Sequence, residues 1–170
     1  SQMFAMKVTN ASASALSKRA GAGMVPVMIS CSDMLWPCAM DVDVTSGALE
    51  TMRAAACAAH PREACGILLG EDGRITAAVV TRNIHATPQS HFEIDPQALI
   101  DAHRAARGGG PSVLGYFHSH PAGPSEPSAT DRAMASGDGR VWAIIAGEDV
   151  RFWKDGEQGF TALSFAVIES

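Results

Sequence analysis

The spacing of apolar residues changes period near residue 45. Val42 and Val44 alternate with polar neighbours, which is typical of a short strand with one buried face. Thr45 or Ser46 can cap a helix, and apolar residues then recur at helical spacing until Pro61, at Leu49, Met52, Ala56 and Ala59. This part of the chain is therefore predicted to form a strand followed by a helix.

A β-hairpin is predicted for the next two apolar segments. The run CGILLG at residues 65–70 is apolar throughout and ends in glycine, as buried strands often do. The turn residues Glu71, Asp72 and Gly73 lead into RITAAVVTRN at 74–83, which alternates and is rich in β-branched residues. Two strands joined by so short a turn are expected to pair antiparallel.

Strand and helix patterns also alternate in the second half of the chain. HFEI at 91–94 predicts a short strand, and Asp95 and Pro96 are placed as the cap and first residue of a helix that ends at three glycines. Further predicted elements are a strand at 113–118, a helix from about 129 to 135, and strands near 141–146, 150–153 and 160–168. This mixture indicates the α/β (α+β) class, with helices covering one curved mixed sheet.

Composition narrows the class of protein. The 170 residues are enough for one domain with a substantial core, and 46% hydrophobic with 18% charged residues is a globular composition. No apolar run reaches the 18 residues of a membrane span, and a net charge of -5 argues against a nucleic-acid partner. The four cysteines form no CxxC pair, so reduced thiols and a cytoplasmic location are expected.

The first 39 residues differ from the rest and are predicted to be an extension of unknown role, with the domain spanning 40–170. They are rich in Ala, Ser, Gly and Met and have no sustained period. Lys18 and Arg19 precede an apolar stretch ending at Cys31, which weakly resembles a secretory or lipoprotein signal. Because that stretch is interrupted by glycine and poor in leucine, a plain extension is favoured.

The candidate chemistry lies in HSHP at residues 118–121. In an extended segment His118 and His120 point the same way, so both imidazoles can reach one metal ion. Asp131 can supply a third ligand and leave the fourth tetrahedral position of zinc to water, as in catalytic sites. Glu63 is then the candidate base. A charge next to the apolar run CGILL is costly unless something holds it, which argues against a solvated carboxylate at this position.

Each of these residues also has a simpler interpretation. An HxH pair alone is common in loops, a lone Glu is commonly a solvated surface carboxylate, and Ser128 with Asp131 forms an SxxD helix-start signature. Ser128 and Asp131 can cap the helix and also take part in the chemistry. Ser119 is expected to face away from the metal, and the remaining histidines are interpreted as surface or packing residues: His60, His85, His91 and His103.

Taken together, the residues resemble the JAMM motif of the MPN-domain metalloproteases. That motif is a Glu, then HxHP, six residues, Ser, two residues and Asp, and this chain matches it at every position. The segment PREACGILLG, with Glu63, is similar to the one that bears the catalytic Glu in compact bacterial and archaeal members. The resemblance covers about residues 40–168 and implies a single MPN-like domain with a cytidine-deaminase-like fold.

The resemblance also implies a mechanism and a substrate. It implies one zinc ion on His118, His120 and Asp131, Glu63 as the base for the attacking water, and Ser128 as a donor to the oxyanion. The expected substrate is an isopeptide or peptide bond at the C-terminal tail of a ubiquitin-like or sulfur-carrier-like protein. Two alternatives stay open: a hydrolase of small or cell-wall peptides, and a non-catalytic MPN scaffold, against which the complete motif counts.

Overall fold

The computed structural model describes residues 41–169. The predictions for residues 1–39 lie outside this range, so the domain boundary at residue 40 stays a prediction. The strands are β1 (Val42–Thr45), β2 (Cys65–Glu71), β3 (Arg74–Thr81), β4 (Ser112–Ser119), β5 (Val141–Ala146), β6 (Asp149–Gly156), β7 (Gly159–Leu163) and β8 (Phe165–Ile168). The helices are α1 (Ser46–Ala59), α2 (Pro96–Arg107) and α3 (Ala129–Met134), and in this part of the chain no helix is long and apolar enough to cross a membrane.

The eight described strands form one mixed sheet, in agreement with the predicted class. Their order is β7-β6-β5-β4-β2-β3-β1-β8. The pairs β4·β5, β1·β3 and β1·β8 are parallel, and the other pairs are antiparallel. The predicted hairpin is β2 and β3, and Thr45 caps α1 by accepting a hydrogen bond from Ala48 N.

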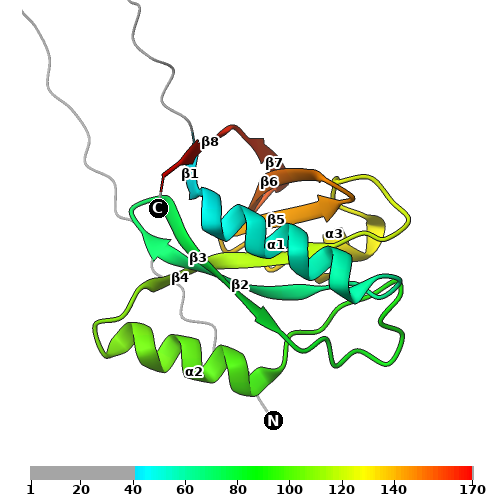
Figure 1. Cartoon of the computed structure of the whole chain (residues 1–170), viewed down its shortest axis with the longest axis horizontal. Coiled ribbons are helices and arrows are strands. Elements are labelled where there is room, and N and C mark those ends of the chain that lie inside the picture. Colours follow the sequence, from blue (N-terminus) through cyan, green and yellow to red (C-terminus); the bar gives the residue numbers. More distant parts are fainter. Residues whose placement is uncertain (1–40, 170) are drawn as a thin grey trace, which may run out of the picture. The chain divides into compact units, whose positions relative to one another are not determined.

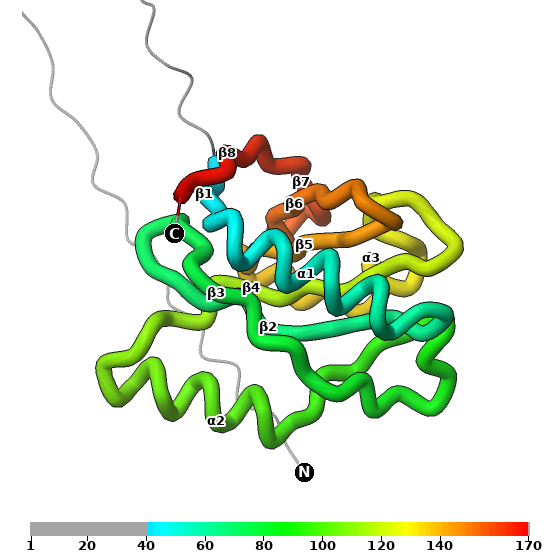
Figure 2. Tube along the Cα trace, viewed as in Figure 1, coloured from blue at the N-terminus to red at the C-terminus, as the bar shows by residue number. Residues whose placement is uncertain are grey.

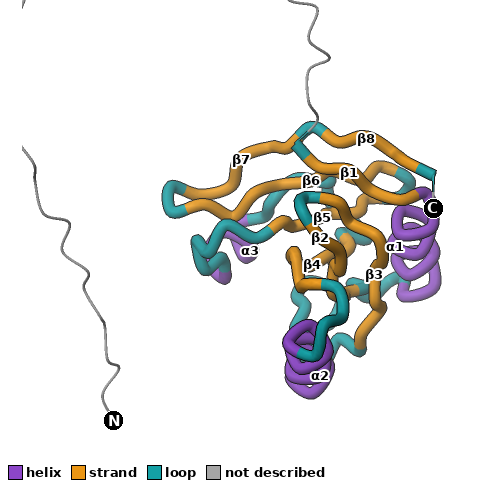
Figure 3. Tube along the Cα trace, turned by 90° about the vertical axis from the view of Figure 1, so that its left-hand side faces the viewer, coloured by secondary structure: helices purple, strands orange, loops and turns teal. Residues whose placement is uncertain are grey.

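The sheet curls until its two edges meet. β7 and β8 are opposite edges of the sheet, yet only Ser164 separates them along the chain, and Figure 3 shows the chain passing directly from one to the other. Ser164 N and Oγ both donate to Asp41 Oδ2 at 2.9 Å, which holds this junction. The single strand predicted at 160–168 is therefore wrong: its first half pairs with β6 and its second half with β1.

The strand predicted at 91–94 is also wrong. Ile94 forms only an isolated bridge with Asn83, and residues 82–95 are the connection between β3 and α2. β2 already has β3 and β4 as neighbours, so the sheet offers no free edge beside it for another strand. The apolar residues Phe92 and Ile94 instead pack as parts of a loop against the sheet face covered by α2.

α1 and α2 cover opposite faces of the sheet. In the view of Figure 1, α1 lies above β2 and α2 below it. Phe117 of β4 packs in the core on the α1 face, whereas Tyr116 packs with α2 on the other face. Because side chains alternate along a strand, His118 lies in phase with Tyr116 and faces the α2 side.

Candidate metal centre and active site

Three side chains with metal-ligand atoms converge at the C-terminal end of β4. His118 Nε2 lies 3.0 Å from His120 Nε2 and 3.1 Å from Asp131 Oδ1, and His120 Nε2 lies 3.2 Å from Asp131 Oδ2. All three residues are buried, with His118 only 1% exposed. Within residues 41–169 they are the one group of His, Cys, Asp or Glu side chains that could hold a metal ion.

This trio fits a tetrahedral zinc ion. Zinc binds imidazole nitrogen and carboxylate oxygen at about 2.0–2.1 Å, which places neighbouring ligand atoms of a tetrahedron about 3.3 Å apart. The two imidazole nitrogens, 3.0 Å apart, are close to that value, and each also lies 3.1 or 3.2 Å from one of the two Asp131 oxygens. With one ligand atom taken from each residue, all three atoms lie within 4.8 Å of one another. Three protein ligands leave one position for water or substrate, which is the arrangement of catalytic zinc sites and not of structural ones.

The sheet places the two histidines. His118 pairs with Cys65 of β2 on one side and with Ile144 of β5 on the other. His120 N donates to Ile145 O at 2.8 Å, so the backbone stays extended beyond the end of β4. Side chains two residues apart in an extended chain face the same way, and both imidazoles therefore reach one point.

Different contacts orient the two rings. His120 Nδ1 donates to Pro124 O at 2.7 Å, which leaves the Nε2 lone pair for a metal. His118 Nδ1 is buried without a hydrogen-bond partner among the described residues. The His118 ring is instead stacked on Phe92, with centroids 4.3 Å apart and planes at 16°, and meets Trp142 edge-on at 5.8 Å. Aromatic packing thus holds this ring in place.

A capping box holds Asp131 in the first turn of α3. Ser128 Oγ accepts from Asp131 N at 3.1 Å, and Asp131 Oδ2 accepts from Ser128 N at 2.7 Å. The cap uses the Ser128 oxygen as an acceptor, so the hydroxyl hydrogen remains available to donate. The capping role of SxxD is therefore present, and it is compatible with the oxyanion role, which stays a prediction.

Burial and mutual contacts shift the pKa values of the trio. Burial favours the neutral form of Asp131, but hydrogen bonds with His118 and His120 outweigh it and hold the pKa of that carboxyl well below its usual range. Burial lowers the pKa of His118. Burial also acts to lower the pKa of His120, but its contacts with Asp131 and Pro124 O raise it overall. These shifts favour the ionised carboxylate of Asp131 and the neutral ring of His118, which are the forms that bind a metal. The raised pKa of His120 favours its protonated form, so metal binding there would release a proton.

Glu63 reaches the trio through pairing between distant segments. It precedes β2, whose first residue Cys65 pairs with His118. Ala64 N donates to Ser119 Oγ at 2.8 Å, and Ser119 N donates to Ala64 O at 3.0 Å. Ser119 is buried at 3% exposure, and it fastens the segment that carries Glu63 to the segment that carries both histidines.

The environment of Glu63 favours its protonated form. Its side chain is buried beside the trio, with 7% exposure for the residue. Burial raises the pKa of Glu63 from its ordinary value of 4.5 to about 7; His120 opposes this rise and Asp131 adds to it. A carboxyl that titrates near neutral pH can both accept a proton and return it.

A groove runs past the trio. Glu63, Ser128 and Asp131 line a cavity of about 390 Å³ whose other walls include the apolar residues Phe92, Ile94, Leu99, Tyr116 and Trp142. A second hollow of about 340 Å³ contains His120 and shares Glu63 and Ser128 with the first. An extended chain lying along both hollows would therefore pass both Glu63 and Ser128.

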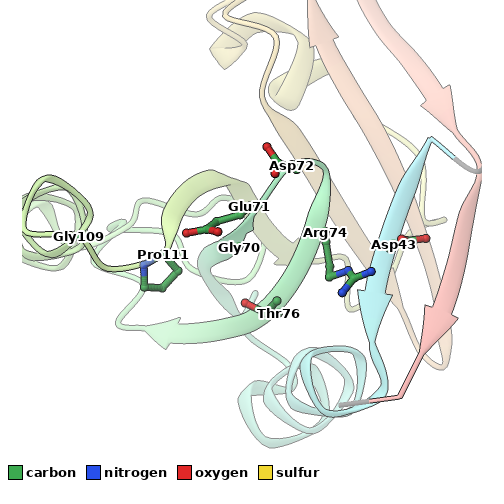
Figure 4. Close-up of a pocket in the computed structure, with 8 residues that line it drawn as sticks. All are labelled: Asp43, Gly70, Glu71, Asp72, Arg74, Thr76, Gly109 and Pro111. Carbon is green, nitrogen blue, oxygen red and sulfur yellow. The ribbon is translucent and has the colours of Figure 1, made fainter.

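A separate polar cleft lies far from this groove. Figure 4 shows its lining, which includes Glu71, Asp72 and Arg74 at the turn of the β2–β3 hairpin. The trio lies at the other end of β2, where Cys65 pairs with His118. The length of this strand, about 20 Å at 3.3 Å per residue, separates the cleft from the trio. The cleft is therefore not part of the candidate site.

Sequence reasoning missed several residues at the groove. His85 and His91, interpreted from the sequence as surface or packing residues, are partly exposed and stack on each other with ring centroids 4.7 Å apart, and both also line the larger cavity. Asn83 and Phe92, on the same connection, contact the Glu63 backbone and the His118 ring. No spacing rule signals these residues, because the path of the 82–95 connection depends on tertiary contacts.

Comparison with known proteins gives relatives whose names agree with this chemistry. A desampylase from Haloferax volcanii is 37% identical over 131 residues, covering 74% of this chain and 92% of the relative. A probable TtuB-protein conjugate cleaving protease from Thermus thermophilus is 35% identical over 106 residues, covering 62% of this chain and 70% of the relative.

Solved structures and a family model agree with the fold. A protein from Desulfitobacterium hafniense has a TM-score of 0.68 at 30% identity, covering 76% of this chain and 94% of that one. A JAB1/MPN domain protein from Archaeoglobus fulgidus is 21% identical with a TM-score of 0.50, and the match covers 75% of this chain and 97% of that one. At this identity the likeness bears on the fold alone. The model for prokaryotic homologs of the JAB domain matches residues 45–156. The chain therefore belongs to this compact prokaryotic JAB family, the JAMM/MPN proteins that its motif resembles.

Proposed function

We propose that this protein is a zinc-dependent metallopeptidase that hydrolyses an isopeptide or peptide bond at the C-terminal tail of a ubiquitin-like or sulfur-carrier-like protein. One observation carries the proposal: a zinc-compatible trio, the buried carboxyl of Glu63 and the hydroxyl of Ser128 lie along one groove. The substrate class is supported by relatives named as a desampylase and as a conjugate cleaving protease.

Each group in the groove has a distinct part in this reaction. Zinc on His118, His120 and Asp131 would lower the pKa of a water toward about 7 and polarise the scissile carbonyl. Glu63 takes a proton from the attacking water and returns it to the leaving amine. The Ser128 hydroxyl donates a hydrogen bond to the carbonyl oxygen as negative charge develops on it.

The shape of the groove agrees with an extended substrate. The two hollows share Glu63 and Ser128, so together they offer a path along which an extended chain can lie. A protein tail enters such a path as an extended strand, with main-chain groups available for pairing. The scissile bond would then lie between the base and the oxyanion donor.

Cleavage assays with the zinc-loaded full chain test the proposal. The probes are a ubiquitin-like or sulfur-carrier protein joined through its C-terminus to a lysine side chain, the same tail as a linear fusion, and short peptides of cell-wall type. We expect cleavage directly after the tail, its loss on chelation, and its return when zinc is added. The matched control is Asp131→Asn, which is nearly isosteric but lacks the ligand charge.

Other outcomes would favour the alternatives. If the short peptides are cleaved and the protein conjugates are not, the protein is a small-peptide or cell-wall hydrolase with the same zinc chemistry. A chain that carries one zinc and cleaves none of the probes would instead indicate a scaffold. Zinc content is measured in parallel by metal analysis, so that a failure to load the metal is not mistaken for a lack of activity.

A further inference from the structure

The connection between β3 and α2 forms one wall of the groove. Figure 2 shows it as a green loop that leaves β3 and passes beside the start of β2 before entering α2. The loop closes at its base, where Ile84 N donates to Glu93 O at 2.9 Å and Asn83 bridges to Ile94. Between these points it carries His85, His91 and Phe92 into the cavity wall.

The Asn83 side chain sits inside this base and uses its full hydrogen-bonding capacity. Its Oδ1 accepts from His85 N and from Glu93 N, both at 3.1 Å. Its Nδ2 donates to His91 O and to Glu63 O, both at 3.0 Å. The orientation of the amide is defined by its four partners, which are two backbone N–H groups on one side and two carbonyls on the other. A flipped amide would make none of these four hydrogen bonds.

These bonds connect the loop directly to the residue proposed as the base. Asn83 holds the carbonyl of Glu63, while Pro88 O, from the same loop, accepts from Glu63 N at 2.6 Å. The following residue, Ala64, is held by Ser119 between the two histidines. The backbone of Glu63 is thus fixed from the loop side, and that of Ala64 from the side of the metal ligands.

We propose that Asn83 is a positioning residue, whose amide holds Glu63 at the correct distance from the trio and couples it to the wall of the groove. The inference rests on the proposed function, since it assumes Glu63 as the base. Asn83 reaches no ligand atom and acts only through the backbone. A displacement of about 1 Å at a catalytic group can cost about 10²-fold in rate, so loss of this tie is expected to lower kcat.

Asn83→Asp separates positioning of Glu63 from folding of the loop. Aspartate keeps an oxygen that accepts from His85 N and Glu93 N, but it has no donor for Glu63 O and His91 O. We expect one zinc per chain, preserved hydrogen-exchange protection of the His85 and Glu93 amides, and a kcat lowered by about 10- to 10²-fold with little change in KM. Gln97→Glu makes the same amide-to-carboxylate change on the exposed surface of α2 and should leave kcat unchanged.

A double-mutant cycle shows whether Asn83 acts through Glu63. In a Glu63→Gln background the base is already lost, so adding Asn83→Asp should lower the single-turnover rate on the isopeptide conjugate no further. An equal loss in both backgrounds, or a wild-type kcat for Asn83→Asp, would overturn the inference. Asn83→Ala provides a second variant: it also removes the acceptor and should speed exchange across residues 84–93.

The two proposals fail in different ways. If the zinc-loaded wild-type chain cleaves no probe, the proposed function fails, and the role of Asn83 fails with it. If the wild type cleaves the conjugate and Asn83→Asp cleaves it equally well, only the role of Asn83 fails.

Discussion

Glu63→Gln tests the proposed base most directly, because glutamine keeps the size and shape of the side chain but cannot take up the proton. Removing a general base costs on the order of 10² to 10⁴ in rate. Glu63 is not part of the group that could hold the metal ion, so the variant should retain one zinc ion. It should also still bind the substrate, which makes it suitable for capturing the conjugate without cleaving it.

The raised pKa of Glu63 gives a second effect, on stability. Folding raises this pKa from 4.5 to about 7, so Glu63 favours the metal-free fold at acid pH and loses that contribution as pH rises from about 4.5 to 7. At about 1.4 kcal/mol per pKa unit, the loss is at most about 3.5 kcal/mol. Glutamine does not titrate, so at pH 8 the metal-free variant should be more stable than the wild type by about 1–3 kcal/mol, with little of this pH-dependent difference left at pH 4.

The effect on stability is measured by urea unfolding of the metal-free wild type and variant at pH 4 and pH 8. The effect on catalysis is measured by kcat against pH for the zinc-loaded proteins. A bound dication lowers the pKa of Glu63, so the stability comparison requires metal-free protein. In the loaded wild type, kcat should fall as pH drops through the pKa of Glu63, and this limb should be absent in the variant. A variant that loses zinc would make Glu63 a ligand, and a wild-type cleavage rate would place the base elsewhere.

Further predictions concern the ligands, the oxyanion donor, the stacked ring and the extension. His118→Ala and Asp131→Ala should each remove most of the zinc found by metal analysis, and two tightly bound ions in the wild type would contradict a single site. Ser128→Ala should keep zinc but lower turnover by about 10²-fold or more; a lowered Tm with unchanged turnover would leave only the cap. Phe92→Ala should weaken zinc binding by about 10-fold or more, measured by competition with a chelator. Phe92→Leu should lower the zinc affinity less if the bulk of the side chain alone supports the His118 ring. A chain that begins at Met40 should fold, bind zinc and cleave the conjugate; loss of cleavage alone would show that the extension helps to form the site.

The features that depend on local spacing could be predicted from the sequence. His118 and His120 face one side because an extended chain has a period of two, and the Ser128–Asp131 spacing makes a capping box wherever a helix starts. The helices and most strands follow from their apolar periods for the same reason. The three candidate zinc ligands could therefore be named before any tertiary contact was considered, and their binding of zinc stays a prediction.

Only the tertiary structure decided which distant segments meet. The strand expected at 160–168 breaks at Ser164 because the curled sheet brings its two edges together there, and no local pattern encodes that closure. The pairing of β2 with β4 brings Glu63 beside residues about 55 positions later in the chain, with Ala64 bonded to Ser119. Asn83 bonds to the Glu63 backbone only because the loop closes at its base. Local spacing acts over a few residues, whereas these contacts depend on strand order and on burial of both sheet faces, which the whole chain determines.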